Sequence, residues 1–296
     1  MSVRPKSVLV IGAGAALGLA IVKHLRTEQV EAIGTYRTLR AGVSAKIEAV
    51  GARAEQLDLE DKDRTQALLA EVDAAIMTPI LSASAPAASF LGAGQRAVFF
   101  SSNNVALDPQ AEVYEKLLES ERHLTKSTPQ AVILRPTMIY GYPGDGNMSC
   151  LMTFMQRWPV TPSPGDGAAL QQPVFFDDLA QIAVRVLLSE NQQNGIYAVA
   201  GPAPIPLREL YRQAAAAIGS KTLTVPAPAR LAGKGLQALE SVGLRFPVNA
   251  AQLLRATRDK TPIGENTIFG ETSLERGLSE LAAAMTAAEP QNPPSD

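Results

Sequence analysis

Short apolar runs alternate with helical patterns along the first half of the chain. The first run, Val8 to Ile11, is continuous and rich in β-branched residues, as in a buried strand, and apolar residues then recur at helical spacing as far as Leu25. The same alternation predicts strands at 30–35, 53–57, 74–78, 97–101 and 131–134, and helices at 15–27, 62–71 and 109–126, with a further helical stretch ending at 51. Repeated strand–helix–strand units predict an α/β fold with a doubly wound parallel sheet.

The pattern changes after Arg135. Glycine and proline cluster in 136–147 and 159–167, and helices are expected at 178–188, with Asp177 as its N-cap, and at 207–218, 229–242 and 273–287. We interpret residues 1–288 as one domain of the Rossmann type, in which 136–175 and 200–288 form most of a small C-terminal substrate lobe. The Pro-rich end, 289–296, is expected to be a disordered tail.

The turn between the first strand and the first helix is glycine-rich. It places Gly12, Gly14 and Gly18 between a buried strand and a helix. Such a turn aims backbone N–H groups and the positive end of the helix dipole at one point, and the glycines let a pyrophosphate approach the backbone closely. We therefore predict a dinucleotide site, the alternative being a strand–helix turn without a ligand. The expected cofactor contacts are Gly12, Gly14, Ala15, Ala16, Leu17 and Gly18.

The end of the second strand bears on which dinucleotide binds. An acidic residue at this place holds the ribose diol of NAD, whereas arginine accommodates the 2′-phosphate of NADP. The sequence has no acid there but has Arg37, followed by Arg40. We expect NADP to be preferred to NAD, the alternative for each arginine being a plain surface position.

Composition narrows the class of protein. A chain of 296 residues that is 46% hydrophobic and 19% charged, with a net charge of −2, has the composition of a globular domain and offers no electrostatic attraction for nucleic acid or anionic membrane. No apolar run is long enough to span a bilayer. A signal peptide is not expected either, since glycines interrupt the first apolar run and basic residues follow it. The single cysteine, Cys150, excludes an intrachain disulfide, which is consistent with the reducing environment of the cytoplasm. Together with His24 and His123 it provides too few ligands for zinc, so no metal is expected.

Four segments, in order, resemble a known superfamily. They are Ser7–Gly18; Phe99–Val105, with Ser-Ser-x-x-Val; Ile133–Gly141, with Leu-Arg-Pro-x-x-x-Tyr-Gly; and Leu170–Ala180, which ends in Asp-Leu-Ala. Together they resemble the short-chain dehydrogenase/reductase superfamily, and within it the NAD-dependent epimerase/dehydratase branch, over about residues 7–220. The resemblance implies a nicotinamide cofactor and chemistry on a hydroxyl or carbonyl carbon.

The resemblance also implies roles for individual residues. Ser102 falls at the catalytic serine position, and Tyr114 or Tyr140 would handle the proton. Further cofactor contacts would come from the ends of strands, at Asp58, Leu59, Thr78, Pro79, Ser101 and Pro136. Substrate contacts would come from neighbouring loops, at Asn103, Asn147 and Gln172. Plain alternatives exist, since Ser102 can be a loop hydroxyl bonded to nearby backbone, Asp58 a turn residue and Tyr140 a core residue.

The chain departs from this branch in three places. Ala15 stands at the position of the middle glycine of the branch's glycine motif. The segment between the fourth and fifth strands is short, which reduces the helix that builds the usual dimer in the branch, so a monomer or a homodimer is expected. The Tyr-x-x-x-Lys pair is broken, because Tyr114 is followed at the helical spacing by Leu118, and Lys116 lies on another side of the helix. This break resembles the atypical members, which include reductases, isomerases and cofactor-sensing proteins.

Two functions therefore remain open. The first is an NAD(P)-dependent oxidoreductase or epimerase that acts on a hydroxyl or carbonyl carbon of a small substrate, with nucleotide sugars as a candidate class. The second is a non-catalytic NAD(P)-binding sensor or scaffold.

Overall fold

The computed structural model describes residues 4–128, 130–189, 194–227, 257–264 and 266–288. The chain divides into two compact units. The first comprises Met1–Pro136, Phe176–Val199 and Pro262–Gly270, and the second comprises Thr137–Phe175, Ala200–Thr261 and Glu271–Asp296. The sequence assigned 136–175 and 200–288 to a substrate lobe, whereas in the structure the stretch 262–270 lies with the first unit.

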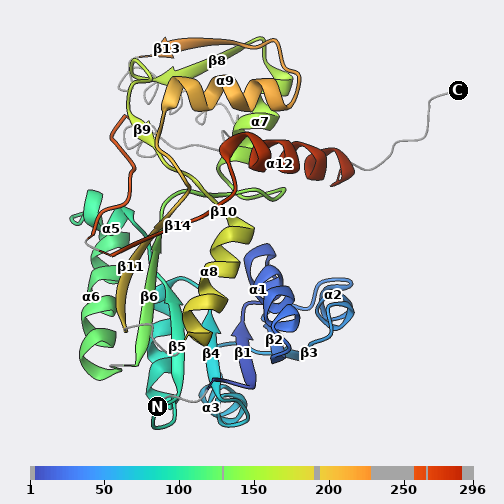
Figure 1. The fold of residues 1–296 in the computed structure, drawn as a ribbon, viewed down its shortest axis with the longest axis vertical. Coiled ribbons are helices and arrows are strands. Elements are labelled where there is room, and N and C mark those ends of the chain that lie inside the picture. Colours follow the sequence, from blue (N-terminus) through green and yellow to red (C-terminus); the bar gives the residue numbers. More distant parts are fainter. Residues whose placement is uncertain (1–3, 129, 190–193, 228–256, 265, 289–296) are drawn as a thin grey trace, which may run out of the picture. The chain divides into compact units, whose positions relative to one another are not determined.

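The first unit is built on an eight-stranded sheet with the order β14-β11-β6-β5-β4-β1-β2-β3 (Figure 1). The strands from β11 to β3 in this order pair in parallel. Their bounds are β1 Ser7–Ile11, β2 Glu31–Tyr36, β3 Arg53–Gln56, β4 Ala74–Met77, β5 Arg96–Phe100, β6 Ala131–Pro136, β11 Gly195–Ala200 and β14 Thr267–Phe269. The predicted doubly wound parallel α/β sheet is thus confirmed.

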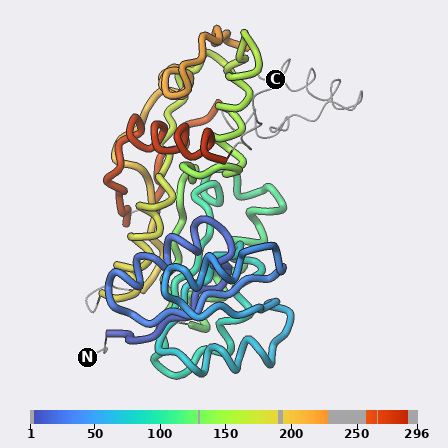
Figure 2. The backbone as a smooth tube through the Cα atoms, turned by 90° about the vertical axis from the view of Figure 1, so that its right-hand side faces the viewer, coloured from blue at the N-terminus to red at the C-terminus, as the bar shows by residue number. Residues whose placement is uncertain are grey.

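Helices cover both faces of this sheet. Helices α1 (Ala16–Thr27) and α8 (Phe176–Leu188) pack against each other on one face, beside α2 (Val43–Ala49). Helix α3 (Lys62–Ala70), α4 (Leu81–Ser84), the 3₁₀ helix η1 (Ala85–Phe90), α5 (Asn104–Leu107) and α6 (Glu112–Ser127) make up the other layer. In Figure 2 the blue and cyan part of the chain turns back on itself several times, as the alternation of strands and helices requires. Because helices cover both faces of the sheet, successive residues of a central strand are buried, and such strands are continuous apolar runs. Val8 to Val10 in β1 are accordingly fully buried.

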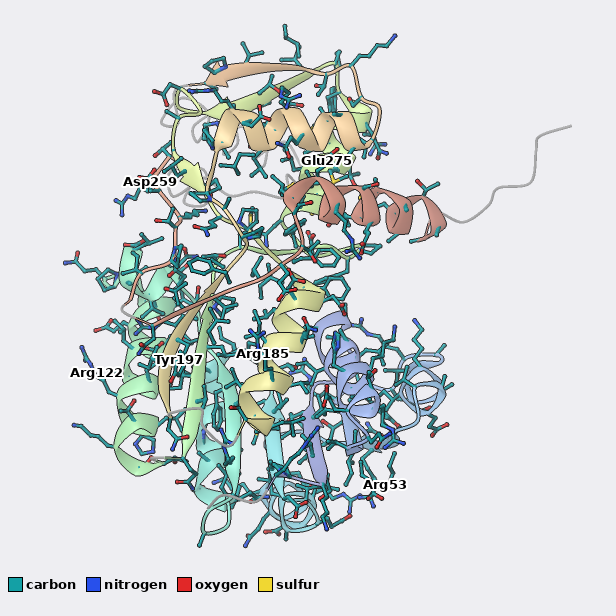
Figure 3. The ribbon with its side chains drawn as sticks, in the orientation of Figure 1. Arg53, Arg122, Arg185, Tyr197, Asp259 and Glu275 are labelled. Carbon is teal, nitrogen blue, oxygen red and sulfur yellow. The ribbon has the colours of Figure 1, made fainter. Side chains whose placement is uncertain are left out.

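Helix α6 shows how the sequence pattern produces this packing. Its inner face carries Tyr114, Leu117 and Leu124, which join the apolar core beneath the sheet. Its outer face is charged, and Arg122 points away from the helix (Figure 3). On this inner side Glu121, only 2% exposed, accepts from Nε of Arg135 at 2.8 Å, so a forked ion pair ties α6 to β6.

The second unit is made of short strand pairs and three described helices. Strand β7 (Ile139–Tyr140) pairs with β10 (Val174–Phe175), β9 (Leu170–Gln171) with β12 (Ile205–Pro206), and β8 (Val160–Pro164) with β13 (Leu223–Ala227). The helices are α7 (Met148–Arg157), α9 (Leu207–Ala217) and α12 (Leu274–Ala288).

Some predicted boundaries are wrong. Helix α6 starts at Glu112 rather than at Pro109, because Ala111 donates to the carbonyl of Asp108 at 3.1 Å and Pro109 lies inside that turn, a position that suits its fixed φ. Helix α8 starts at Phe176, so Asp177 is in its first turn and is not its N-cap. The loop expected at 159–167 contains strand β8, since its prolines lie in a two-stranded sheet where the missing N–H is tolerated. The helix predicted at 229–242 and the tail at 289–296 lie outside the described residues.

Among the described helices, none is both long and apolar enough to cross a membrane.

Candidate functional site

The glycine-rich turn after β1 is clamped by the two neighbouring strands. Gly12 has a φ of +89°, which favours glycine, and its N–H donates to Oγ1 of Thr35 on β2 at 3.2 Å. On the other side Thr78, which follows β4, donates from Oγ1 to the carbonyl of Ile11 at 2.8 Å. A Cβ at Gly12 would lie 2.3 Å from that Thr78 oxygen. Thr78, a predicted cofactor contact, therefore shapes the turn itself.

Helix α1 rests directly on this turn. A Cβ at Gly18 would lie 2.3 Å from the carbonyl oxygen of Gly12 and 2.7 Å from Cα of Ala13, both of them backbone atoms. At Gly14 the closest atoms would be side-chain carbons of Tyr36 and Val43, each 3.1 Å away. Gly18 is therefore the position at which the turn least tolerates a side chain.

The first turn of α1 offers backbone donors that no side chain caps. Its N-cap is Ala15, which has no side-chain acceptor, and no acidic residue lies in the first turn. The N–H groups of Ala16, Leu17 and Gly18 have no carbonyl acceptor within the helix. Together with the positive end of the helix dipole, these donors form a site for an anion.

A second polar group at the same edge of the sheet lacks a partner. Ser101 follows β5, and its Oγ is buried with no hydrogen-bond partner among the described residues. A buried hydroxyl without a partner is uncommon and is expected where a ligand supplies one. The carboxyl ends of β1, β4 and β5 are neighbours in the sheet. The glycine cradle, the uncapped helix and the Ser101 hydroxyl therefore fit a dinucleotide.

The ends of β2 and β3 carry the residues expected at the adenosine part of the cofactor. Arg37 and Arg40 are exposed, and neither guanidinium pairs with a carboxylate within the described ranges. Asp58 is exposed and accepts from the N–H of Glu60 at 3.1 Å, the turn role that was its alternative reading. Leu59 packs against the apolar core, and Pro79 is half-buried beside Thr78.

A hydrogen-bonded set of polar residues follows β5. The Oγ of Ser102 accepts from the backbone N–H of Asn104 at 3.2 Å, and Nδ2 of Asn104 donates to the hydroxyl of Tyr114 at 3.0 Å. Tyr114 is the third residue of α6 and is 9% exposed. The structure thus joins Ser102 and Tyr114, two predicted catalytic residues, through Asn104. Sequence reasoning assigned Asn104 no role, because an asparagine beside another asparagine in a loop carries no periodic signal.

The cation expected beside the tyrosine is absent from the inner face of α6. Leu118, four residues after Tyr114, packs against the apolar core. Lys116 lies on the outside, where Nζ contacts a Glu112 carboxylate oxygen at 2.8 Å. That ion pair raises the pKa of Lys116 and lowers the pKa of Glu112, each through the hydrogen bond between them.

Asn103 and Pro136 hold the backbone around this set. Asn103 is 2% exposed, and its N–H donates to the carbonyl of Pro136 at the end of β6 at 3.0 Å. Its Oδ1 accepts from the N–H of Ile263 at 3.0 Å, which attaches the returning stretch 262–270 to the end of β5. The side-chain oxygen predicted to meet a substrate is therefore bonded to this stretch.

The second unit contains the other three predicted residues. Tyr140 is 1% exposed, meets the ring of Phe175 edge-on at 5.6 Å, and packs so closely under α12 that a Cβ at Gly277 would lie 2.2 Å from its hydroxyl. Gln172 is also buried and donates from Nε2 to the carbonyl of Gly201 at 2.7 Å. Asn147 is exposed at the start of α7. The catalytic role of Tyr140 and the substrate roles of Gln172 and Asn147 stay predictions.

The loop before α7 is organised by a carboxylate that the sequence analysis did not single out. Asp145 accepts from the N–H groups of Asn147 at 2.9 Å and Ser149 at 3.0 Å, and also from the N–H of Gly141 at 3.2 Å. Burial raises the pKa of Tyr142, and the Asp145 charge raises it further. Asp145 thereby caps α7 in place of its N-cap residue, Asn147.

No protein-family model matches the sequence, and no curated protein matches it in sequence. Solved structures do match. A triphenylmethane reductase from Citrobacter sp. has a TM-score of 0.72 at 17% identity, covering 95% of this chain and 99% of that one. A UDP-glucose 4-epimerase from Thermotoga maritima, with UDP-glucose, has a TM-score of 0.69 at 13% identity, covering 95% and 99%. A dTDP-glucose 4,6-dehydratase from Bacillus anthracis, in complex with NAD, has a TM-score of 0.67 at 14% identity, covering 96% and 97%.

The chain has the fold of these epimerases, dehydratases and reductases. The resemblance implied by the four motifs is therefore confirmed at the level of the fold. At these identities the likeness leaves cofactor choice, substrate and reaction to the chain's own residues.

Proposed function

We propose that the protein is an NADP(H)-dependent oxidoreductase or epimerase-like enzyme that acts on a hydroxyl or carbonyl carbon of a small substrate. The observation that carries the proposal is the Ser102–Asn104–Tyr114 set at the carboxyl end of β5. In the same unit, the glycine turn follows β1, which is separated from β5 only by β4. Open parallel sheets bind ligands at this edge, where the connections run to opposite faces.

Each residue of the set has a chemical task. The bound nicotinamide would supply or take up a hydride. Ser102 Oγ accepts from Asn104, and its own hydrogen has no acceptor among the described residues, so it can donate to a substrate carbonyl oxygen. Tyr114 would hold or pass the proton at that oxygen as a general acid or base.

Cofactor choice is assigned to the end of β2. Arg37 is exposed without a carboxylate partner in the described part of the chain, which suits a 2′-phosphate. We therefore propose NADP(H) over NAD(H). Nucleotide sugars are one substrate class to test, because a Thermotoga maritima enzyme of this fold holds UDP-glucose. We further propose a cytoplasmic protein, on the single cysteine, acting as a monomer or a homodimer.

A second candidate is a non-catalytic NADP(H)-binding sensor. The observation that favours it is the inner face of α6, where Leu118 fills the place of the expected cation and Lys116 is engaged at the surface. Such a protein would bind the dinucleotide without hydride transfer.

The experiment combines cofactor binding with turnover. Calorimetric titration with NADPH and with NADH should show tighter binding of NADPH. Arg37→Ala should weaken the affinity for NADPH by about 10–100-fold, because one charge-assisted contact contributes about 1.5–3 kcal/mol, and should leave the affinity for NADH unchanged. Equal losses for both cofactors would contradict the assignment.

Turnover then separates the two functions. NADPH oxidation is followed with a panel of nucleotide sugars, ketones and quinones, and the nucleotide sugars are also analysed by chromatography for epimers, because an epimerase returns its hydride and oxidises no net cofactor. Tyr114→Phe should lower turnover by about 10²–10⁴-fold, with Tyr140→Phe as the comparison for the other predicted tyrosine. If the wild type binds NADPH but neither oxidises it nor converts any member of the panel to an epimer, the sensor is the better account.

A further inference from the structure

We infer that Asn104 is a positioning residue that holds the hydroxyls of Ser102 and Tyr114 in one hydrogen-bonded unit and gives the Tyr114 oxygen a neutral amide donor. The inference deepens the proposed function and rests on it.

The two bonds of Asn104 come from different parts of one residue. Its backbone N–H donates to Ser102 Oγ at 3.2 Å, and its side-chain Nδ2 donates to the Tyr114 hydroxyl at 3.0 Å. Because both donors belong to the same residue, the distance between the two hydroxyls is set by the backbone of Asn104 and by the two torsions of its short side chain.

The backbone on both sides of Asn104 is anchored. Asn103 is bonded to Pro136 through its N–H and to Ile263 through its side chain. Val105, on the other side, is 1% exposed within the apolar core and donates from its N–H to the carbonyl of Ser102 at 3.2 Å. Tyr114 is buried at the start of α6, with its N–H bonded to Ala111 at 2.8 Å. A side chain held between such neighbours is ordered before any ligand binds, which favours catalysis.

The direction of the amide bond decides what Asn104 can do. The amide nitrogen is only a donor, so it stabilises negative charge that develops on the Tyr114 oxygen as the phenol gives up its proton. A lysine ammonium would do the same with a full charge.

The experiment compares Asn104→Ala and Asn104→Asp with Lys116→Met, a control on the helix that carries Tyr114, whose side chain bonds Glu112 at the surface. Asn104→Ala should lower kcat by about 10²-fold, the usual cost of a misplaced reacting group. NADPH affinity and the KM for NADPH should stay unchanged, because Asn104 lies outside the glycine turn. Lys116→Met should match the wild type in every measurement.

Asn104→Asp tests the direction of the bond. An ionised carboxylate only accepts, whereas a protonated carboxyl can donate. Turnover should therefore be poor at neutral pH and should recover as the pH falls toward the ordinary carboxyl pKa of about 3.9, which burial raises. A residue that merely supports the loop would give no such pH profile.

A spectroscopic readout needs no substrate. In ¹⁵N-labelled protein the side-chain amide signals of Asn104 should move in Tyr114→Phe and stay in place in Lys116→Met. Three results would each overturn the inference while leaving the proposed function standing. They are an Asn104→Ala variant as active as a wild type that turns over, full activity of Asn104→Asp at neutral pH, and Asn104 amide signals that do not move in Tyr114→Phe. A wild type that transfers no hydride at all would instead remove the proposed function itself, and the positioning role with it.

Discussion

Replacing Gly18 by alanine should damage the dinucleotide site far more than a single methyl group suggests. Replacing an exposed or unhindered glycine in a helix by alanine raises the free energy of unfolding of the protein by about 1 kcal/mol. At Gly18 the new Cβ would lie 2.3 Å from the Gly12 carbonyl oxygen, whereas ordinary contact begins at 3.4 Å, so about 1 Å of backbone movement is required. Overpacking against a backbone that cannot rotate away costs about 1–3 kcal/mol. We expect the free energy of unfolding to fall by about 0–2 kcal/mol, since the two effects oppose each other.

The loss of cofactor affinity should be larger. A 1 Å displacement takes an N–H···O contact of about 2.9 Å beyond hydrogen-bond range, and each charge-assisted bond lost costs about 1.5–3 kcal/mol, or about 10–100-fold in NADPH affinity. Calorimetry gives the affinity and urea denaturation the stability. Gly14→Ala is the matched control, because the atoms closest to its Cβ are side-chain carbons at 3.1 Å, and the nearest backbone atom is in ordinary contact at 3.8 Å. If Gly18→Ala is more stable than the wild type and binds NADPH equally well, the packing of α1 on the turn has been misread.

Three further changes test the packing and the electrostatics. Glu121→Ala should lower the free energy of unfolding by about 3–5 kcal/mol in urea denaturation, because it leaves the Arg135 guanidinium, whose side chain is only 16% exposed, without its carboxylate; a loss below about 1 kcal/mol would contradict this. Hydrogen bonds from the backbone N–H of Lys6 above all, and from Ser7, lower the pKa of Asp73. The contribution of this carboxylate to stability is therefore present above about pH 4 and is lost as the pH falls through the lowered folded-state pKa. Asp73→Asn should flatten the profile of unfolding free energy against pH on this acid side alone. Leu118→Lys should cost about 1 kcal/mol of lost apolar burial and, because it restores the four-residue spacing from Tyr114, should shift the pH optimum of turnover downward by favouring the phenolate; an unchanged pH optimum would contradict this.

The sequence predicts the first half of the fold well because it is built from buried parallel strands. Strand β4 is apolar along its whole length and β1 is apolar after Ser7, and the helices between them have one apolar face, so period and length identify both. The second unit is harder. Strand β8 contains two prolines and alternates hydroxyl with apolar residues, and its partner β13 lies about sixty positions along the chain. Only the pairing between them, which no local pattern encodes, makes this segment a strand.

The candidate site divides in the same way. The glycine turn is a local feature, and Gly12 and Gly18 are recognisable because the backbone permits nothing larger. Thr78 and Thr35, which clamp the turn, come from strands adjacent in space and distant in sequence. The start of α6 shows a different limit, since Asp108 and Pro109 form a helix-start signal that the chain uses for a turn instead.

The broken Tyr-x-x-x-Lys pair shows why an absent motif does not by itself exclude an activity. Read along α6, Leu118 stands where the motif has its cation, which favours a sensor. In space, the hydroxyl of Tyr114 receives a donor from the preceding loop, where Asn104 is held by its neighbours on both sides. A donor toward a phenol oxygen need not come from the same helix, because electrostatic stabilisation depends on distance and direction and not on chain order. The helix therefore keeps an apolar face at Leu118, which packs its first turns against the core, while the loop supplies the polar contact. The decisive variable for this chain is whether Asn104 orients Tyr114, and that is a property of the loop after β5 rather than of the motif it lacks.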